Sequence, residues 1–156
     1  MIRIRFAIAL LWLMLVLILG STDFAAQETG RFILPVLKLM MPGTPVAQLQ
    51  AIHLVLRKLA HIAEYAVLAL LWFKALHHVA GRTLRTAAWV ALSVCLVCAF
   101  VDEAHQSMIP ARQGSARDFL IDAFGATAML MVARGRASAG DRGSRLRGAV
   151  APEPAD

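Results

Sequence analysis

The chain has 156 residues, of which 59% are hydrophobic and 17% are charged, and its formal net charge is +6 at pH 7. A soluble globular domain carries more charge and fewer apolar residues, so this composition indicates an integral membrane protein. The Lys and Arg residues are scattered over loops and the C-terminal segment and match no nucleic-acid-binding motif, which argues against a nucleic-acid partner.

The first element is an uninterrupted apolar run from Phe6 to Leu19, preceded by Arg3 and Arg5. Such a run is either a first transmembrane helix or the apolar part of a signal peptide. Signal peptidase requires small residues at the first and third positions before the cut, and the sequence around Ala25 lacks that pattern. We therefore expect a retained membrane helix.

The second membrane element is expected to be one long helix. Residues 22–41 mix polar and apolar side chains, which predicts an interfacial loop or a short surface helix. Thr44 and Pro45 then fit an N-cap and a first helical residue. From Leu49 the apolar pattern continues without a break to Phe73, so the first turns of this helix should lie outside the bilayer core.

Two further spans follow a basic turn. Residues 86–101 predict a third transmembrane helix and residues 119–133 a fourth, which is short because a span needs about 20 residues. Residues 134–156 are rich in Gly, Ala, Arg and Pro with no apolar period, so we expect a disordered basic cytoplasmic tail. The predicted fold is an all-α, integral membrane bundle of four transmembrane helices, formed by residues 1–133.

The distribution of basic residues predicts the orientation in the cytoplasmic (inner) membrane. With both termini in the cytoplasm, ten of the 16 Lys and Arg residues lie inside, and most of the acids lie in the outer half. The positive-inside rule favours this arrangement. The protein should therefore be a multi-pass protein whose acidic end faces away from the cytoplasm.

Polar residues in the second helix share one face. Arg57, His61 and Glu64 are separated by four and three residues, which places them on one side of a helix with Leu68. Glu64 should lie on the order of 10 Å deeper than Arg57, at about 1.5 Å per residue.

The third and fourth helices have similar faces at the same depth. In the third, Cys95, Cys98, Asp102 and Gln106 share a face, with His105 beside them and Glu103 turned away. In the fourth, the shared face holds Asp118, Asp122, Gly125 and Met129. Gly125 would let another helix approach closely.

Together these residues predict a polar pocket that opens to the outer surface. A charged group near the bilayer centre costs about 2.5–3.5 kcal/mol, so such groups usually face a bundle interior and pair with one another. Both signs of charge are available here. The predicted ligand-binding residues are Arg57, Lys58, His61, Glu64, Tyr65, Asp102, Glu103, Gln106, Arg112, Arg117, Asp118 and Asp122.

Structural explanations also exist for several of these residues. Ser115 and Asp118 have the spacing of a capping box, and Lys58 could hold its helix at the headgroup level. The pair His61 and Glu64, like Asp102 and His105, could share a metal ion. A network of ion pairs and hydrogen bonds uses the same groups, so we expect no metal and no cofactor.

At these positions the sequence resembles the VanZ-like family of small membrane proteins, named for a teicoplanin-resistance accessory protein. The resemblance extends from about Leu10 to Val132. It rests on two spaced motifs and a later glycine: Arg57, Lys58, His61, Glu64, Tyr65 and Leu68, then Asp102, Glu103, Gln106, Pro110, Arg112, Gly114, Ser115 and Asp118, then Gly125.

The resemblance implies a multi-helix membrane protein of the cell envelope, in some members linked to resistance against glycopeptides that bind a lipid-linked precursor. It implies no reaction. Two positions depart from the family pattern. Asp122 stands where an Asn is usual, which removes a neutral hydrogen-bonding side chain, and Ala111 stands where a Gly often precedes the Arg, which loosens the turn.

Three functions fit this pattern. The first is binding or modulation of an anionic membrane lipid or lipid-linked cell-wall precursor, because arginine suits phosphates and carboxylates. The second is an enzyme acting on a lipid headgroup, although no serine elbow or phosphate loop is present. Its candidate catalytic residues are His61, Glu64, Asp102, Glu103 and His105. The third is a small transporter, which would require an oligomer, and the oligomeric state stays open.

Overall fold

The computed structural model describes residues 2–21, 26–79, 82–108 and 115–150, with the backbone alone at residues 26 and 143–150. Every regular element in these ranges is an α-helix, so the all-α prediction is confirmed. The helices are α1 (Ile2–Leu19), α2 (Ala26–Met40), α3 (Val46–His77), α4 (Leu84–Ser107) and α5 (Ala116–Val150).

Three of these helices, α1, α3 and α4, are long and apolar enough to cross a membrane. The chain is therefore a multi-pass membrane protein. We expected four spans, but α5 does not meet the same criterion among the described residues. The reason is local, because Asp118, Asp122 and Arg134 interrupt or bound its apolar stretch. The fourth crossing stays a prediction.

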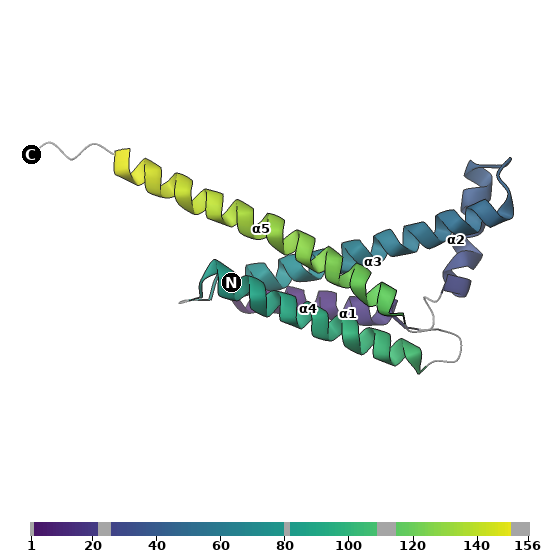
Figure 1. Ribbon diagram of the computed structural model, residues 1–156, viewed down its shortest axis with the longest axis horizontal. Helices are drawn as coiled ribbons and strands as arrows, with labels where there is room; N and C mark the ends of the chain where they lie inside the picture. Colours follow the sequence, from purple (N-terminus) through teal and green to yellow (C-terminus); the bar gives the residue numbers. More distant parts are fainter. Residues whose placement is uncertain (1, 22–25, 80–81, 109–114, 151–156) are drawn as a thin grey trace, which may run out of the picture.

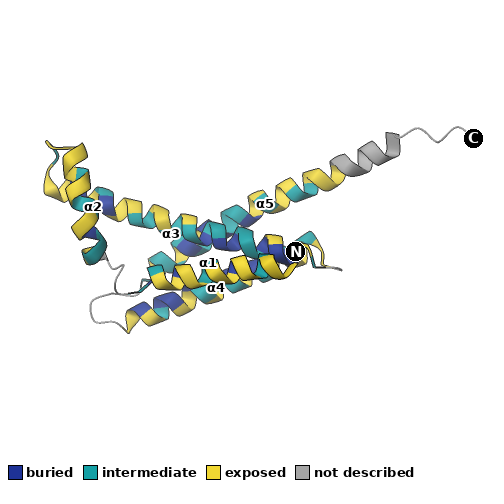
Figure 2. Cartoon of the chain, turned by 180° about the vertical axis from the view of Figure 1, so that it is seen from behind, coloured by how far each residue is buried: buried dark blue, intermediate teal, exposed yellow. Residues whose placement is uncertain are grey.

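Helix α3 is the central element of the bundle. It contacts each of the other four helices, most extensively α5, while α1 and α4 pack beside it (Figure 1). The apolar interior is formed where Tyr65, Leu68 and Phe73 of α3 meet α4 and α5. Buried positions are concentrated in this middle part of the bundle (Figure 2).

Helix α4 packs through small residues. Ala87, Ala91, Cys95 and Ala99 recur at every fourth position and are at most 1% exposed. Small side chains on one stripe allow neighbouring helix backbones to approach closely. Both cysteines are free, and Cys95 serves as a small apolar residue in this stripe.

Helix α2 packs across the first part of α3, away from the rest of the bundle (Figure 1). Of the two alternatives for this segment, the short helix is the one observed. Phe32 is 76% and Leu39 is 84% exposed, as expected for a helix with one face toward lipid or its interface. Helix α3 begins at Val46 with Pro45 at the N-cap, one residue later than expected.

Helix α5 continues to Val150 and projects from the bundle (Figure 1). We expected a disordered tail from residue 134, and residues 134–150 differ by being helical. Ala and Arg, which favour helices, make up eight of residues 134–150, and none of these residues is proline. The last expected tail residues, 151–156, lie outside the described residues.

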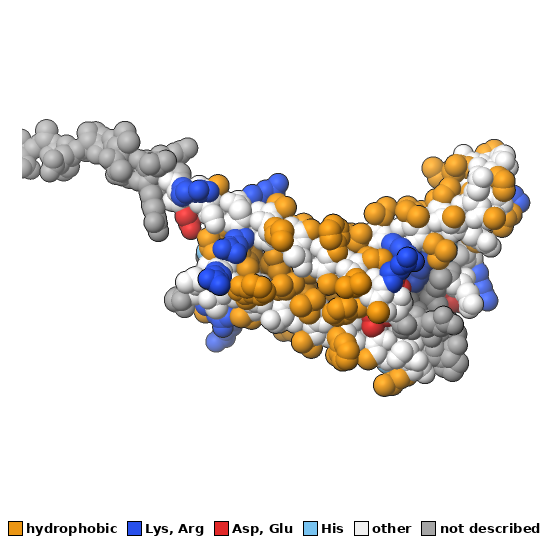
Figure 3. Space-filling model, in the orientation of Figure 1, with side chains coloured by type: hydrophobic (Ala, Val, Ile, Leu, Met, Phe, Trp, Pro, Cys, Tyr) orange, Lys and Arg blue, Asp and Glu red, His pale blue; other side chains and the backbone are white. Residues whose placement is uncertain are grey.

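The surface agrees with a membrane location. Hydrophobic side chains cover the middle of the bundle on the face shown in Figure 3, and Lys and Arg side chains flank them at both ends. This order of apolar belt and flanking cations is typical of proteins that span a bilayer.

Candidate functional site

Arg57, His61 and Glu64 line one cavity of about 180 Å³. They lie on the same face of α3, as their spacing predicted. The other lining residues come from the end of α1, from α2 and from α3 itself: Leu19, Thr29, Ile33, Leu56 and Ala60. The cavity therefore has polar groups at Arg57, His61 and Glu64 of α3 and at Thr29 of α2, and apolar side chains elsewhere.

Thr29 of α2 is a cavity residue that the sequence analysis did not identify. Its hydroxyl oxygen accepts a hydrogen bond of 3.0 Å from Nη1 of Arg57 and lies 3.2 Å from Nε2 of His53. His53 is 4% exposed. The spacing of four residues between His53 and Arg57 was the available signal, since it places both on one helix face.

Trp12 ties α1 to the same region. Its indole Nε1 donates a hydrogen bond of 3.0 Å to the backbone oxygen of Glu64. This bond joins α1 to the turn of α3 that holds Glu64. The indole is a natural reporter for events in the cavity.

His61 links the cavity to the bundle interior. Its Nδ1 lies 3.2 Å from Oδ1 of Asp122 on α5, and the Asp122 side chain has no exposed surface. The close contact of the two helices depends on Gly125. A Cβ added there would lie 2.5 Å from the backbone oxygen of Ile62, which confirms that Gly125 permits a close helix approach.

On α4, Asp102 and Gln106 form a buried pair. The Gln106 Nε2 donates a hydrogen bond of 2.7 Å to Oδ2 of Asp102, and both side chains are at most 5% exposed. Their predicted common face is confirmed. The last turn of α1 meets them, because a Cβ added to Gly20 would collide with the Asp102 carboxylate.

Glu103 does not turn away from this cluster, so that expectation was wrong. It is 9% exposed, and its Oε2 accepts a hydrogen bond of 2.6 Å from the backbone N–H of Ser115. The chain folds back after α4, so the start of α5 covers the end of α4 and buries the Glu103 carboxylate. The position of Glu103 on the α4 helix does not by itself indicate this contact.

Lys58 and Asp118 connect α3 with α5. The Lys58 Nζ lies 2.7 Å from Oδ1 of Asp118, and their side chains are 43% and 35% exposed. The Ser115 hydroxyl accepts from the N–H of Arg117 and so caps α5. Asp118 is thus directed to Lys58 and is not explained by a capping role alone.

The remaining predicted residues have different surroundings. His105 and Arg117 are exposed, so neither belongs to the buried cluster. Tyr65 is 1% exposed in the apolar interior and does not line the cavity. Arg112, with Pro110 and Gly114, lies outside the described residues.

The buried cluster has more acids than bases. The carboxylates of Asp102, Glu103 and Asp122 are buried, whereas no Lys or Arg side chain that the structure describes is buried. Among the described side chains, Oδ2 of Asp122 and Oε1 of Glu103 have no hydrogen-bond partner. No three His, Cys, Asp or Glu residues in the described ranges are placed to hold a metal ion.

The fold and this site define a class: a helical multi-pass membrane protein with a polar cluster shared by three helices and a small cavity at its edge. A family model described as VanZ/LLP1 matches residues 6–137 of the chain. The chain belongs to this family, which confirms the resemblance found in the sequence motifs. No curated protein and no solved structure matches it.

Proposed function

We propose that this protein binds the anionic headgroup of a membrane lipid or lipid-linked cell-wall precursor. The supporting observation is the cavity that places Arg57, His61 and Glu64 opposite apolar residues such as Leu19 and Ile33. A guanidinium suits phosphate and carboxylate groups, while the apolar wall suits the first carbons of a lipid chain.

The depth of the cavity supports a ligand held at the membrane surface. Lys58 and Lys74 are 16 residues apart in α3, or about 24 Å at about 1.5 Å per residue. The hydrocarbon core is about 30 Å thick, so each lysine can reach one headgroup layer. Arg57 then lies at the level of phosphates, and Glu64 lies about two turns deeper.

We further propose that this headgroup layer is the outer one of the cytoplasmic membrane, with α5 as a fourth span and both termini inside. The acids of the cluster lie at this end, whereas Arg3, Arg5, Lys74, Arg82 and Arg85 lie at the other. The positive-inside rule favours that polarity. Asp122 is paired with His61 inside the bundle, so its charge need not face lipid.

Photo-crosslinking in cells tests the ligand class. A photoreactive amino acid at Ala60, which lines the cavity, should capture phosphate-bearing lipids or polyprenyl precursors selectively. Ala63 is exposed on the same helix but does not line the cavity, so the same probe there should capture bulk lipid. Identical lipid profiles at the two positions would refute selective binding.

The family also motivates a physiological test. If this protein modulates a lipid-linked precursor, deletion of its gene should change susceptibility to teicoplanin, and the Arg57→Gln variant should fail to restore it. If Arg57→Gln restores the original susceptibility at equal protein levels, the effect on resistance does not depend on the cavity.

A second candidate function is hydrolysis or transfer at a lipid headgroup. The observation that favours it is the contact of His61 with the buried Asp122, beside Glu64 in the cavity. A carboxylate that orients an imidazole is a common arrangement for a general base. In this role His61 would accept a proton from the attacking water or alcohol.

An assay on reconstituted protein distinguishes the two functions. An enzyme should release phosphate or a headgroup from envelope lipids, and His61→Gln should abolish the release in protein that still folds. If the protein binds envelope lipids but releases no product from any of them, with and without divalent cations, the enzymatic function is refuted and lipid binding remains.

A further inference from the structure

A second cavity, of about 400 Å³, lies at the opposite end of the bundle between α1 and α3. Its lining residues are Arg5, Ile8, Leu71, Lys74 and His78. Lys74 follows Arg57 by 17 residues in the same helix, a separation of about 25 Å. This cavity is therefore independent of the site around Arg57.

Two cations from different helices converge on this cavity. Arg5 is contributed by α1 and Lys74 by α3, and no acid lines the space. In the part of the chain that the structure describes, no ion pair involves either residue. His78 ends α3 here, with its ring Nδ1 2.9 Å from the backbone oxygen of Lys74.

The order of charged and apolar residues is the same on both walls. From this end of the bundle, residue numbers increase along α1 into the membrane and decrease along α3. Ile8 therefore lies about one turn deeper than Arg5, and Leu71 lies about one turn deeper than Lys74. One turn corresponds to about 5 Å of depth. The cavity thus has cations at its outer level and aliphatic side chains beneath them.

We propose that this cavity binds an anionic glycerophospholipid of the leaflet on its own side of the membrane. The phosphate and the charged headgroup would lie between Arg5 and Lys74, and the glycerol and first acyl carbons against Ile8 and Leu71. A zwitterionic lipid has the same chains but brings a cation to the two basic residues, so it fits less well.

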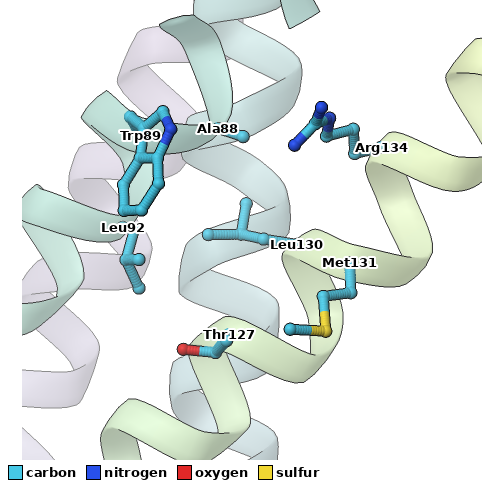
Figure 4. A pocket seen from close by; sticks show the side chains of 7 residues that line it. All are labelled: Ala88, Trp89, Leu92, Thr127, Leu130, Met131 and Arg134. Atoms are coloured by element: carbon cyan, nitrogen blue, oxygen red, sulfur yellow. The ribbon is translucent and has the colours of Figure 1, made fainter. Parts of the chain in front are cut away.

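The groove between α4 and α5 is a useful comparison. It is smaller, about 130 Å³, and is lined by Trp89, Leu92 and Met131, with Arg134 extending over one end (Figure 4). Only one cation lies there. The α1–α3 cavity is larger and has two, so it should be the tighter site for an anionic lipid.

Native mass spectrometry of the full-length protein in detergent tests the proposal. Phosphatidylglycerol and phosphatidylcholine with identical acyl chains are titrated separately, and inorganic phosphate is added as a competitor. The test variant is Arg5→Gln/Lys74→Gln. The control is Arg3→Gln/Arg82→Gln, which removes the same net charge from two exposed residues that do not line the cavity.

We expect the wild type to bind phosphatidylglycerol more tightly than phosphatidylcholine. The test variant should lose roughly 25-fold in affinity for phosphatidylglycerol, a factor of about five for each cation near the headgroup. The control variant should stay within about twofold of wild type, and Arg5→Lys/Lys74→Arg should retain binding.

Three results would overturn the proposal: equal loss in the control variant, equal affinity for the two lipids, or displacement of phosphatidylglycerol by inorganic phosphate. Thermal unfolding checks that the variants fold. If the double variant does not, Lys74→Gln is compared with Arg82→Gln, since both positions are exposed. A loss of about fivefold for the first alone supports the site, and equal binding refutes it.

Discussion

Nδ1 of His61 lies 3.2 Å from Oδ1 of Asp122, the one aspartate among the described residues with no exposed surface. This contact joins the cavity wall on α3 to the acidic cluster between α4 and α5. An unpaired charge that is buried away from water is strongly unfavourable. The pair is therefore expected to be as important for folding as for binding.

Replacing both partners should destabilise the protein by less than the sum of the two single replacements. His61→Leu leaves the Asp122 carboxylate buried without its partner and should lower the free energy of unfolding by about 3 kcal/mol. Asp122→Leu should also be destabilising. In the double variant the effects should be less than additive by about 1–3 kcal/mol, as measured by denaturant unfolding in micelles. Strict additivity would show that the residues do not interact.

Gly125 should be far less tolerant of a methyl group than Gly135. Gly125→Ala places a Cβ 2.5 Å from the Ile62 backbone oxygen, whereas a Cβ at Gly135 meets nothing within 4 Å. We expect the first variant to lose about 2 kcal/mol or more in unfolding free energy, because α3 and α5 must separate. Gly135→Ala, in the same helix, should be neutral or stabilising by up to about 1 kcal/mol. Equal effects would contradict the observed helix contact.

The ion pair between Lys58 and Asp118 should contribute little to stability. Both side chains are more than one-third exposed, at 43% and 35%. Exposed ion pairs contribute at most about 1 kcal/mol, so Lys58→Gln should change the unfolding free energy by less than that. A loss as large as that of His61→Leu would mean that the pair is shielded from water in the membrane.

Thr29 should hold α2 against α3. The Thr29→Val variant removes the hydroxyl that accepts from Arg57 and contacts His53. We expect faster hydrogen–deuterium exchange in α2 and little change in α4. Thr29→Ser keeps the hydroxyl and should behave like the wild type. If valine leaves exchange in α2 unchanged, apolar packing alone holds this helix.

The sequence predicted those features that depend on residues close together along the chain. Apolar runs located the three spans, and three- and four-residue spacings correctly grouped Arg57, His61 and Glu64 on one wall and Asp102 with Gln106 on another. The same spacings marked Gly125 as a point of close approach. In each case the property belongs to one helix and follows from its periodicity.

Contacts between distant segments were less predictable. Glu103 is buried because Ser115 of the returning chain donates to it, and the geometry of α4 alone contains no sign of that partner. Thr29 was missed because its role depends on how α2 crosses α3. The helical extension of α5 was also missed, since Gly and charged residues resemble a disordered tail in composition although the segment lacks proline.

The central proposal is that the cavity at Arg57 binds an anionic lipid headgroup. Fluorescence of Trp12 can report it, because the Trp12 indole is bonded to the Glu64 backbone. Trp72→Phe and Trp89→Phe remove the other two tryptophans. In this background a polyprenyl diphosphate in micelles is titrated into the protein.

The decisive measurement is the Kd of that titration for the parent protein, for Arg57→Gln and for Arg31→Gln. Arg31 is exposed on α2, where it pairs with Glu28 and does not line the cavity. We expect Arg57→Gln to raise the Kd at least about tenfold, since a hydrogen bond to a charged group contributes about 1.5–3 kcal/mol, and Arg31→Gln to leave it unchanged. Equal Kd values for folded Arg57→Gln and the parent protein would contradict the proposed site.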